Sequence, residues 1–252
     1  MVRRREEFLK EMGIAPLWKK KHGAAAPADE PVLFEPATTL DDNGAVAKAT
    51  ADLQPIAEMN WEELEAAVSG CTRCGLCRGR TRTVFGVGDR EADWLFIGEG
   101  PGYYEDKQGE PFVGRSGMLL DNMLVTLNLK RGANAYIANV VKCRASDAQG
   151  KDRPPTPEEI ATCLPYLKRQ IELIQPARML ALGKTAALAL LEMEPSTPVG
   201  QLRGQVYAYR HIPLVVTYHP AYLLRQPTEK RKAWSDLCLA ASAFMRTQPN
   251  PE

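Results

Sequence analysis

Four short apolar runs alternate with segments of helical periodicity, and this alternation constrains the fold more than any other feature of the sequence. Turn-forming residues bound each run, and the runs cover residues 93–98, 135–141, 178–183 and 213–219. Helical patterns cover residues 116–129, 157–175, 184–193 and 229–246. Short, continuously apolar strands are typical of parallel sheets that helices cover on both faces. The sequence therefore predicts an α/β fold, a three-layer α/β/α sandwich with a short, mostly parallel four-stranded sheet.

Composition divides the chain into three parts. Residues 1–22 form a basic segment with scattered apolar positions, suited to a docking peptide. Residues 23–60 are rich in alanine, proline and acidic residues, which is typical of a disordered linker. Asn60 can cap a helix that begins at Trp61, so we expect the folded domain to cover residues 61–248.

Charge and hydropathy limit where the protein works. The net charge is only +1, so overall electrostatics does not indicate a nucleic-acid partner, although basic clusters at residues 78–82 and 225–232 can hold phosphates. No apolar run approaches the ~20 residues of a membrane span, and no signal-type apolar core follows the basic N-terminus. We therefore expect a cytoplasmic monomer without a membrane partner.

The cysteines indicate a metal centre. The chain has six of them, and disulfides are rare in the cytosol. Cys71 and Cys74 form a C-x2-C pair, and Cys143 and Cys163 could complete a four-thiolate site. Such a site holds either zinc or an iron–sulfur cluster, and spacing alone does not decide between them. Cys77 leaves the register open, because it has the same spacing from Cys74.

A second candidate site lies at the carboxyl ends of the predicted strands, where ligands of such folds bind. The loop GEGPGYYEDKQGEPFVGRSG, residues 98–117, starts at one strand end, and Asn139 and His219 end two others. Phe112 lies within this loop, where neighbouring glycines would leave it free to face a ligand; the alternative is that it fills the core. An amide, an imidazole, an aromatic ring and several carboxylates suit a planar heterocycle better than a phosphate, because carboxylates repel phosphate.

At these residues the sequence resembles the family 4 uracil-DNA glycosylases, the iron–sulfur-containing branch of their superfamily. The motifs that carry the resemblance are the loop above, NVVKC from residue 139, HPAYLL from residue 219, and CTRC from residue 71 followed by RTRTVFGVGD. Together they span about residues 61–246. The resemblance implies a DNA repair enzyme that flips uracil out of DNA and hydrolyses its N-glycosidic bond, leaving an abasic site.

The resemblance also implies roles for individual residues. Phe112 would stack on the flipped ring, and Asn139 would read the uracil edge through its amide. Glu99 and Gly100 would shape the first motif, and Glu105 would place or polarise the attacking water. Position 100 is more often alanine in the family, so Gly100 is a departure from its pattern.

Further implied roles concern the leaving base and the duplex. His219 would hydrogen-bond a uracil carbonyl oxygen as negative charge grows on the departing base. Leu223, Leu224 and Arg225 are candidates to fill or brace the gap in the DNA. Tyr103 is another departure from the family pattern, as is its neighbour Tyr104, since small or acidic residues are frequent at these positions.

For the cysteines, the resemblance implies a structural 4Fe–4S cluster bound by Cys71, Cys74, Cys143 and Cys163. It leaves Cys77 outside the ligand set. Two alternatives from other classes remain open: a non-catalytic iron–sulfur module that binds nucleic acid or senses redox state, and a zinc-stabilised nucleotide-binding protein.

The expected partner is uracil-containing DNA, and the expected location is the bacterial cytoplasm, associated with the nucleoid. Residues 1–22 lie outside the family core and are similar to the N-terminal peptide of the psi subunit of the bacterial clamp loader. One hypothesis is therefore that this segment tethers the enzyme to the replication machinery. The alternative is a short segment that packs on its own domain or stays disordered.

Overall fold

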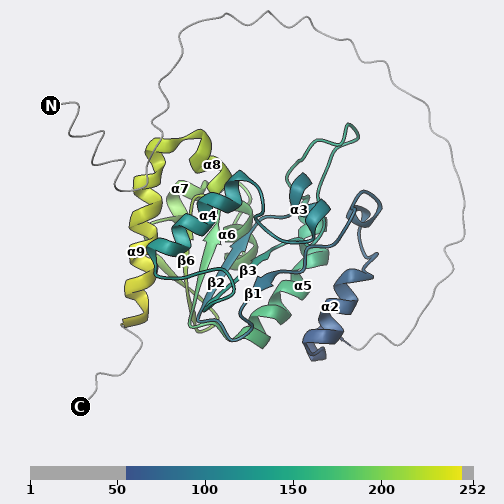
Figure 1. Ribbon diagram of the computed structural model, residues 1–252, viewed down its shortest axis with the longest axis horizontal. Coiled ribbons are helices and arrows are strands. Elements are labelled where there is room, and N and C mark those ends of the chain that lie inside the picture. Colours follow the sequence, from purple (N-terminus) through teal and green to yellow (C-terminus); the bar gives the residue numbers. More distant parts are fainter. Residues whose placement is uncertain (1–54, 246–252) are drawn as a thin grey trace, which may run out of the picture. The chain divides into compact units, whose positions relative to one another are not determined.

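The computed structural model describes residues 55–245 (Figure 1). The predictions for residues 1–22, and those for the linker up to residue 54, fall outside the described residues. Ile56 and Met59, which precede the predicted start of the folded domain at Trp61, pack against the core. Arg169 fixes this entry to the domain, since its Nε donates a hydrogen bond to the Met59 carbonyl at 2.7 Å.

One sheet of six strands, in the order β1-β3-β2-β4-β6-β5, forms the centre of the domain. Its four central strands are the four predicted ones, and their neighbours are parallel: β2 (Trp94–Gly98), β3 (Ala135–Asn139), β4 (Arg178–Leu182) and β6 (Ile212–Thr217). The two edge strands pair antiparallel, and they are β1 (Val87–Gly88) and β5 (Val206–Tyr209). The predicted strand count of four was therefore too low. β1 has only two residues and β5 is partly exposed, so neither carries the buried apolar run that marks a central strand.

Helices surround this sheet, and several begin where the sequence indicates. The α-helices are α2 (Trp61–Ser69), α3 (Tyr103–Gln108), α4 (Arg115–Thr126), α5 (Pro157–Ile174), α6 (Lys184–Leu191), α7 (Val199–Leu202), α8 (Pro220–Arg225) and α9 (Lys230–Met245). The short 3-10 helices are η1 (Ile56–Glu58), η2 (Gly75–Arg78) and η3 (Pro227–Glu229). Asn60 and Thr156 each cap the following helix, because their side-chain oxygens accept the backbone N–H of the residue at the third helical position. That residue is a glutamate in both helices, and its carboxylate accepts the backbone N–H of the capping residue.

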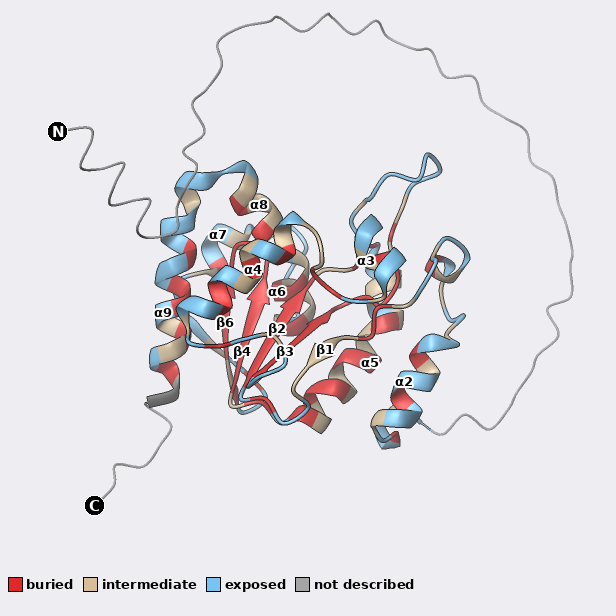
Figure 2. Ribbon diagram, in the orientation of Figure 1, coloured by how far each residue is buried: buried red, intermediate tan, exposed pale blue. Residues whose placement is uncertain are grey.

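The two faces of the sheet face different helices, which gives the three predicted layers. Alternate strand residues point to opposite faces, so Leu95 and Ile97 pack with α2 and α5 in one core cluster. Trp94 and Phe96 pack with α4 and α9 in the other. Figure 2 shows the strands as the buried centre, with exposed residues on the outer sides of the helices. None of the helices within residues 55–245 combines the length and apolar character needed to cross a bilayer.

Candidate active site

A cleft of about 860 Å³ opens at the carboxyl ends of the central strands. Because these strands are parallel, their ends meet at one edge of the sheet. The cleft is lined by most of the predicted site residues, namely Glu99, Gly100, Glu105, Phe112, Asn139, His219, Leu224 and Arg225. The tertiary structure thus brings together side chains that are up to about half the chain apart in sequence.

Asn139, the last residue of β3, lies at the floor of this cleft. Its side chain is buried, and its Oδ1 has no hydrogen-bond partner within the described part of the chain. The side chain lies over Gly98, where an added Cβ would touch Asn139 and approach Cζ of Phe112 to 2.6 Å. Leaving a buried polar atom unpaired is costly, so Asn139 is placed for an external hydrogen-bonding ligand.

Phe112 is held beside this amide in a strained conformation. Its φ of 55° is in the left-handed region, which a bulky residue rarely adopts. Arg131 holds the strained turn, since its guanidinium donates to the carbonyl oxygens of Pro111 at 2.8 Å and Phe112 at 2.9 Å. Asp121 on α4 orients that guanidinium at 2.9 Å. The strain is maintained by dedicated contacts, as expected at a functional site.

His219 lies next to Phe112 at the start of α8. The two rings stack with centroids 5.4 Å apart and planes inclined by 27°. The backbone N–H of Ala221 donates to Nδ1 of His219 at 3.2 Å, so a neutral ring carries its proton on Nε2. Burial, aided by the positive charge of Arg225, lowers the pKa of His219 from 6.5 to about 4. The imidazole is therefore a neutral N–H donor at physiological pH.

The end of β4 has to come close to His219. Gly183 has a φ of +94°, and a Cβ there would lie 2.9 Å from the Cβ of His219. Glycine is the residue that tolerates both the backbone conformation and the close approach. This packing fixes the histidine against the neighbouring strand end.

Glu99 is oriented by a residue for which the sequence pattern contained no signal. The hydroxyl of Thr185, on α6, donates a hydrogen bond to Oε2 of Glu99. The contact joins the loop after β2 to the helix after β4, two segments 86 positions apart. An isolated threonine on a helix carries no recognisable motif, so only the fold identifies its position.

Glu105 closes the glycine-rich loop on itself. Its Oε1 accepts the backbone N–H groups of Val113 at 3.1 Å and Gly114 at 3.4 Å, and its Oε2 accepts that of Gly102 at 3.2 Å. The hydrogen bonds from Val113 and Gly114 use both lone pairs of Oε1, whereas Oε2 can accept one more hydrogen bond. Glu105 therefore holds the shape of the loop, and one oxygen lone pair is left for a water molecule.

The three predicted DNA contacts on α8 lie in different surroundings. Leu223 is 1% exposed and packs in the core beneath α8, whose neighbour is α4. Leu224 and Arg225 line the cleft. A helix of six residues with a buried face sends its leucines in different directions, and the sequence HPAYLL does not say which leucine is buried.

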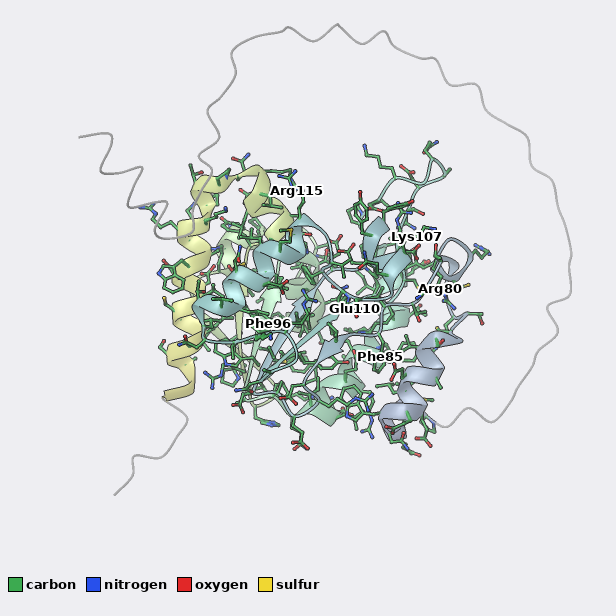
Figure 3. All side chains as sticks on the ribbon, in the orientation of Figure 1. Arg80, Phe85, Phe96, Lys107, Glu110 and Arg115 are labelled. Atoms are coloured by element: carbon green, nitrogen blue, oxygen red, sulfur yellow. The ribbon has the colours of Figure 1, made fainter. Side chains whose placement is uncertain are left out.

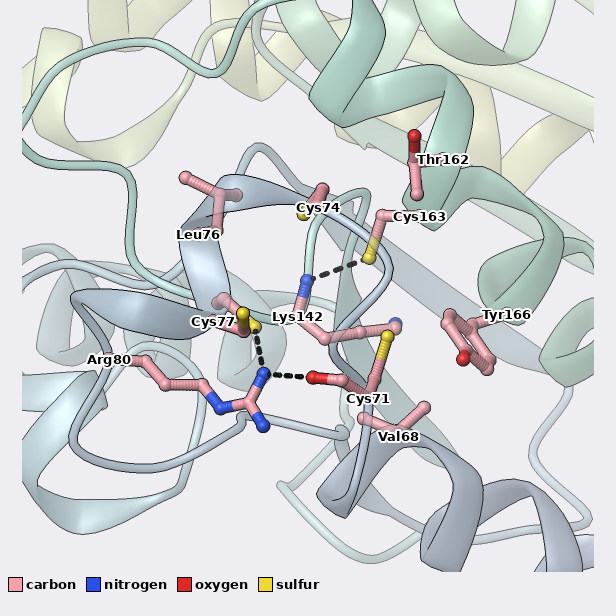
Figure 4. A pocket seen from close by; sticks show the side chains of 11 residues that line it. Val68, Cys71, Cys74, Leu76, Cys77, Arg80, Lys142, Thr162, Cys163 and Tyr166 are labelled. Carbon is pink, nitrogen blue, oxygen red and sulfur yellow. Dashed lines mark hydrogen bonds between the residues drawn. The ribbon is translucent and has the colours of Figure 1, made fainter. Parts of the chain in front are cut away.

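The four cysteines of the proposed cluster line a second, separate cavity (Figure 4). They come from the loop after α2, the segment after β3, and α5: Cys71, Cys74, Cys143 and Cys163. Cys77, on η2, lines the same cavity. Among residues 55–245, no three cysteine, histidine or acidic side chains converge as ligands of a single metal ion.

Hydrogen bonds to two of these sulfurs fit thiolate ligands of a metal centre. Arg80 Nη1 donates to Sγ of Cys143 at 3.3 Å and to the Cys71 carbonyl at 2.6 Å. The Lys142 backbone N–H donates to Sγ of Cys163 at 3.2 Å. N–H groups that point at cysteine sulfurs stabilise the negative charge of metal-bound thiolates. The residues present therefore fit an iron–sulfur cluster.

Lys142 connects the two cavities. Its side chain is 1% exposed, and its Nζ donates to the carbonyl of Asn139 at 2.8 Å and to Gln170 Oε1 at 2.6 Å. Burial lowers the pKa of Lys142 to about 8. The backbone of Asn139 is thus hydrogen-bonded to Lys142, which lines the cysteine cavity. Both residues belong to the motif NVVKC, but the sequence does not show that they are in contact.

Comparisons with known proteins agree with this geometry. A family model described as the uracil DNA glycosylase superfamily matches residues 85–239. The type-4 uracil-DNA glycosylase of Thermotoga maritima is 42% identical, over 74% of this chain and 95% of its own. The type-4 uracil-DNA glycosylase of Pyrobaculum aerophilum is 37% identical, over 72% of this chain and 93% of its own. That of Archaeoglobus fulgidus is 36% identical, over 75% of this chain and 95% of its own. The chain therefore belongs to the uracil-DNA glycosylase superfamily, in its type-4 branch.

Proposed function

We propose that this protein removes uracil from DNA by hydrolysing the N-glycosidic bond, as a glycosylase of base excision repair. The observation that carries the proposal is the buried, unpaired Oδ1 of Asn139 beside the stacked rings of Phe112 and His219. Together they form a site for a flat heterocycle with hydrogen-bonding groups at its edge. Base flipping would bring uracil to it at a cost of a few kcal/mol.

The edge of uracil carries an N–H group between two carbonyl groups. The Oδ1 of Asn139 accepts the uracil N–H, and its amide NH2 donates to a neighbouring carbonyl. Phe112 supplies an aromatic surface for the ring.

The reaction separates charge, and the cleft has groups for both sides. The bond between C1′ and the base breaks with its electron pair going to uracil, and the Nε2–H of neutral His219 stabilises the resulting oxyanion. The sugar becomes cation-like, which the carboxylates of Glu99 and Glu105 stabilise. A water held by Oε2 of Glu105 adds its oxygen to C1′, and its proton passes to the departed base.

The same proposal includes a 4Fe–4S cluster held by Cys71, Cys74, Cys143 and Cys163. It is supported by the family, by the thiol donor set and by the N–H groups that point at two of the sulfurs. When bound, the cluster is structural and fastens the loop after α2 to β3 and α5.

A cytoplasmic location at the bacterial nucleoid, where the DNA substrate lies, belongs to the proposal. A monomeric state is part of the same proposal. Residues 1–22 are proposed to contact the clamp loader. A peptide of these residues that retains no clamp-loader subunit in a pull-down would overturn that contact without affecting the glycosylase.

The test is uracil excision from a labelled oligonucleotide by anaerobically purified, cluster-loaded protein, read after alkaline cleavage of abasic sites. Wild-type protein is expected to cut the strand, and His219→Ala should lose at least about tenfold in rate, or roughly 1.4 kcal/mol of barrier, while remaining folded. A cluster-loaded protein that cuts neither single nor double strands would favour a non-catalytic iron–sulfur module that binds nucleic acid. Full activity of His219→Ala would contradict the role of the imidazole.

A further inference from the structure

Two adjacent tyrosines stand exposed at the rim of the cleft. The side chains of Tyr103 and Tyr104, at the start of α3, are 49% and 63% exposed, and both line the cleft. The other exposed large hydrophobic residues of the described chain lie outside the cleft, and they are Met118, Val125, Met193, Val206 and Trp234. Neither tyrosine has a role in the mechanism proposed above.

The pair is held in a defined arrangement rather than left free. The two rings meet edge to face with centroids 5.5 Å apart, a favoured aromatic geometry. The Arg144 guanidinium lies 5.1 Å from the centroid of Tyr103 and Lys107 Nζ lies 5.8 Å from it. Arg144 is itself fixed by Asp152 at 2.5 Å. Tyr103 is therefore already in contact with cations, and the ring of Tyr104 remains the more open surface.

Charge around the cleft favours a nucleic-acid strand as the occupant of this surface. Four basic side chains line the same cleft, against three acidic ones: Arg115, Arg153, Lys184 and Arg225, with Glu99, Glu105 and Asp152. Figure 3 shows Arg115 near α8 and Lys107 on α3. Aromatic rings combined with a basic groove are the means by which proteins bind unpaired strands, because every base has a face on which a ring can stack.

We infer that Tyr103 and Tyr104 form a stacking platform for the base next to the flipped uracil, and that this platform favours uracil in unpaired DNA. The inference rests on the proposed function and adds a substrate preference to it. In a duplex, the neighbouring base is stacked on both faces and paired, so a tyrosine gains little by contacting it. In a single strand that base has a free face, and stacking on Tyr104 adds binding energy.

The experiment compares Tyr103→Ala, Tyr104→Ala and Tyr104→Phe with wild type and with Trp234→Ala, an exposed aromatic outside the cleft. Single-turnover excision is measured on one uracil oligonucleotide, once single-stranded and once in duplex. Binding is measured by fluorescence anisotropy of a uracil-free single strand, and stacking by the fluorescence of 2-aminopurine placed next to the uracil. The tyrosines are exposed, so the variants should unfold at the wild-type temperature.

The inference predicts that Tyr104→Ala weakens single-strand binding and excision by roughly tenfold, toward the lower end of the range for a lost base–aromatic stack. Duplex excision should change less than threefold, and 2-aminopurine should be quenched by wild type and by Tyr104→Phe but not by Tyr104→Ala. Tyr103→Ala should act in the same direction, and Trp234→Ala should match wild type. Equal losses on single strand and duplex, or no loss on either, would overturn the inference.

The two proposals fail in different ways. If wild type excises no uracil but Tyr104→Ala still loses single-strand affinity and quenching, the glycosylase proposal is contradicted and the platform is supported. If wild type excises uracil and Tyr104→Ala binds single strands as tightly as wild type does, the platform is contradicted and the glycosylase stands.

Discussion

The imidazole of His219 stacks on the ring of Phe112 at a centroid distance of 5.4 Å, although the two residues follow different strands of the sheet. Phe112 comes from the loop after β2, and His219 follows β6. The imidazole is half-buried, and its packing and the charge of Arg225 keep it neutral. The stacking on Phe112 also places the ring beside the surface proposed for the base.

The first prediction concerns the pH dependence of His219. Its pKa is about 4 in the folded protein and near 6.5 when exposed, so the unfolded chain binds the proton more readily between these values. The contribution of His219 to the free energy of unfolding should be complete above pH 6.5 and lost as the pH falls toward 4. NMR titration of the imidazole, assigned with His219→Ala, measures the pKa directly. An inflection near pH 6.5 would contradict the lowered pKa of the imidazole.

A second prediction concerns the buried amide. Asn139→Asp keeps the size of the side chain but replaces the NH2 donor with an oxygen, so it should lower uracil excision by roughly 100-fold or more, in line with the cost of an unmatched buried group. The measurement is kcat/KM on a uracil oligonucleotide, with circular dichroism as a check of folding. A folded Asn139→Asp variant within threefold of wild type would show that the amide does not read the base.

A third prediction concerns the contact between Thr185 and Glu99. Thr185→Val has nearly the same shape but no hydroxyl, so Glu99 loses its hydrogen bond and should be held less firmly. We expect kcat to fall about fivefold to tenfold, which corresponds to the roughly 1–1.4 kcal/mol of an ordinary hydrogen bond. Thr185→Ser restores the hydroxyl and should recover most of the rate. Equal activity of the valine and serine variants would leave Thr185 without a positioning role.

A fourth prediction separates the cysteines of the second cavity. Cys71→Ser should lose bound iron and the visible absorption of the cluster, since it removes a proposed ligand. Cys77→Ser is the matched control, because Cys77 lines the same cavity but is outside the proposed ligand set. It should keep its iron and its thermal unfolding temperature. Iron content and absorbance of anaerobically purified protein are the measurements. Iron loss in Cys77→Ser together with iron retention in Cys71→Ser would shift the ligand pair from Cys71 and Cys74 to Cys74 and Cys77.

The sequence by itself determined the fold class and most of the cleft. Buried parallel strands need continuous apolar runs, and the residues at their carboxyl ends must meet at one edge of the sheet. The order of residues along the chain therefore suffices to assign Asn139, His219 and the loop from Gly98 to one site. Helix caps such as Asn60 and Thr156 are equally local, because each depends on residues three positions apart.

Only the tertiary structure decided which side of a helix or loop faces the ligand. It placed Leu223 in the core and Leu224 in the cleft, brought Thr185 to Glu99, and tied Lys142 to Asn139. It also added the edge strands β1 and β5, which are too short or too exposed to leave an apolar run. These features depend on packing between segments far apart in the chain, and packing energy is a property of the assembled fold rather than of any local pattern.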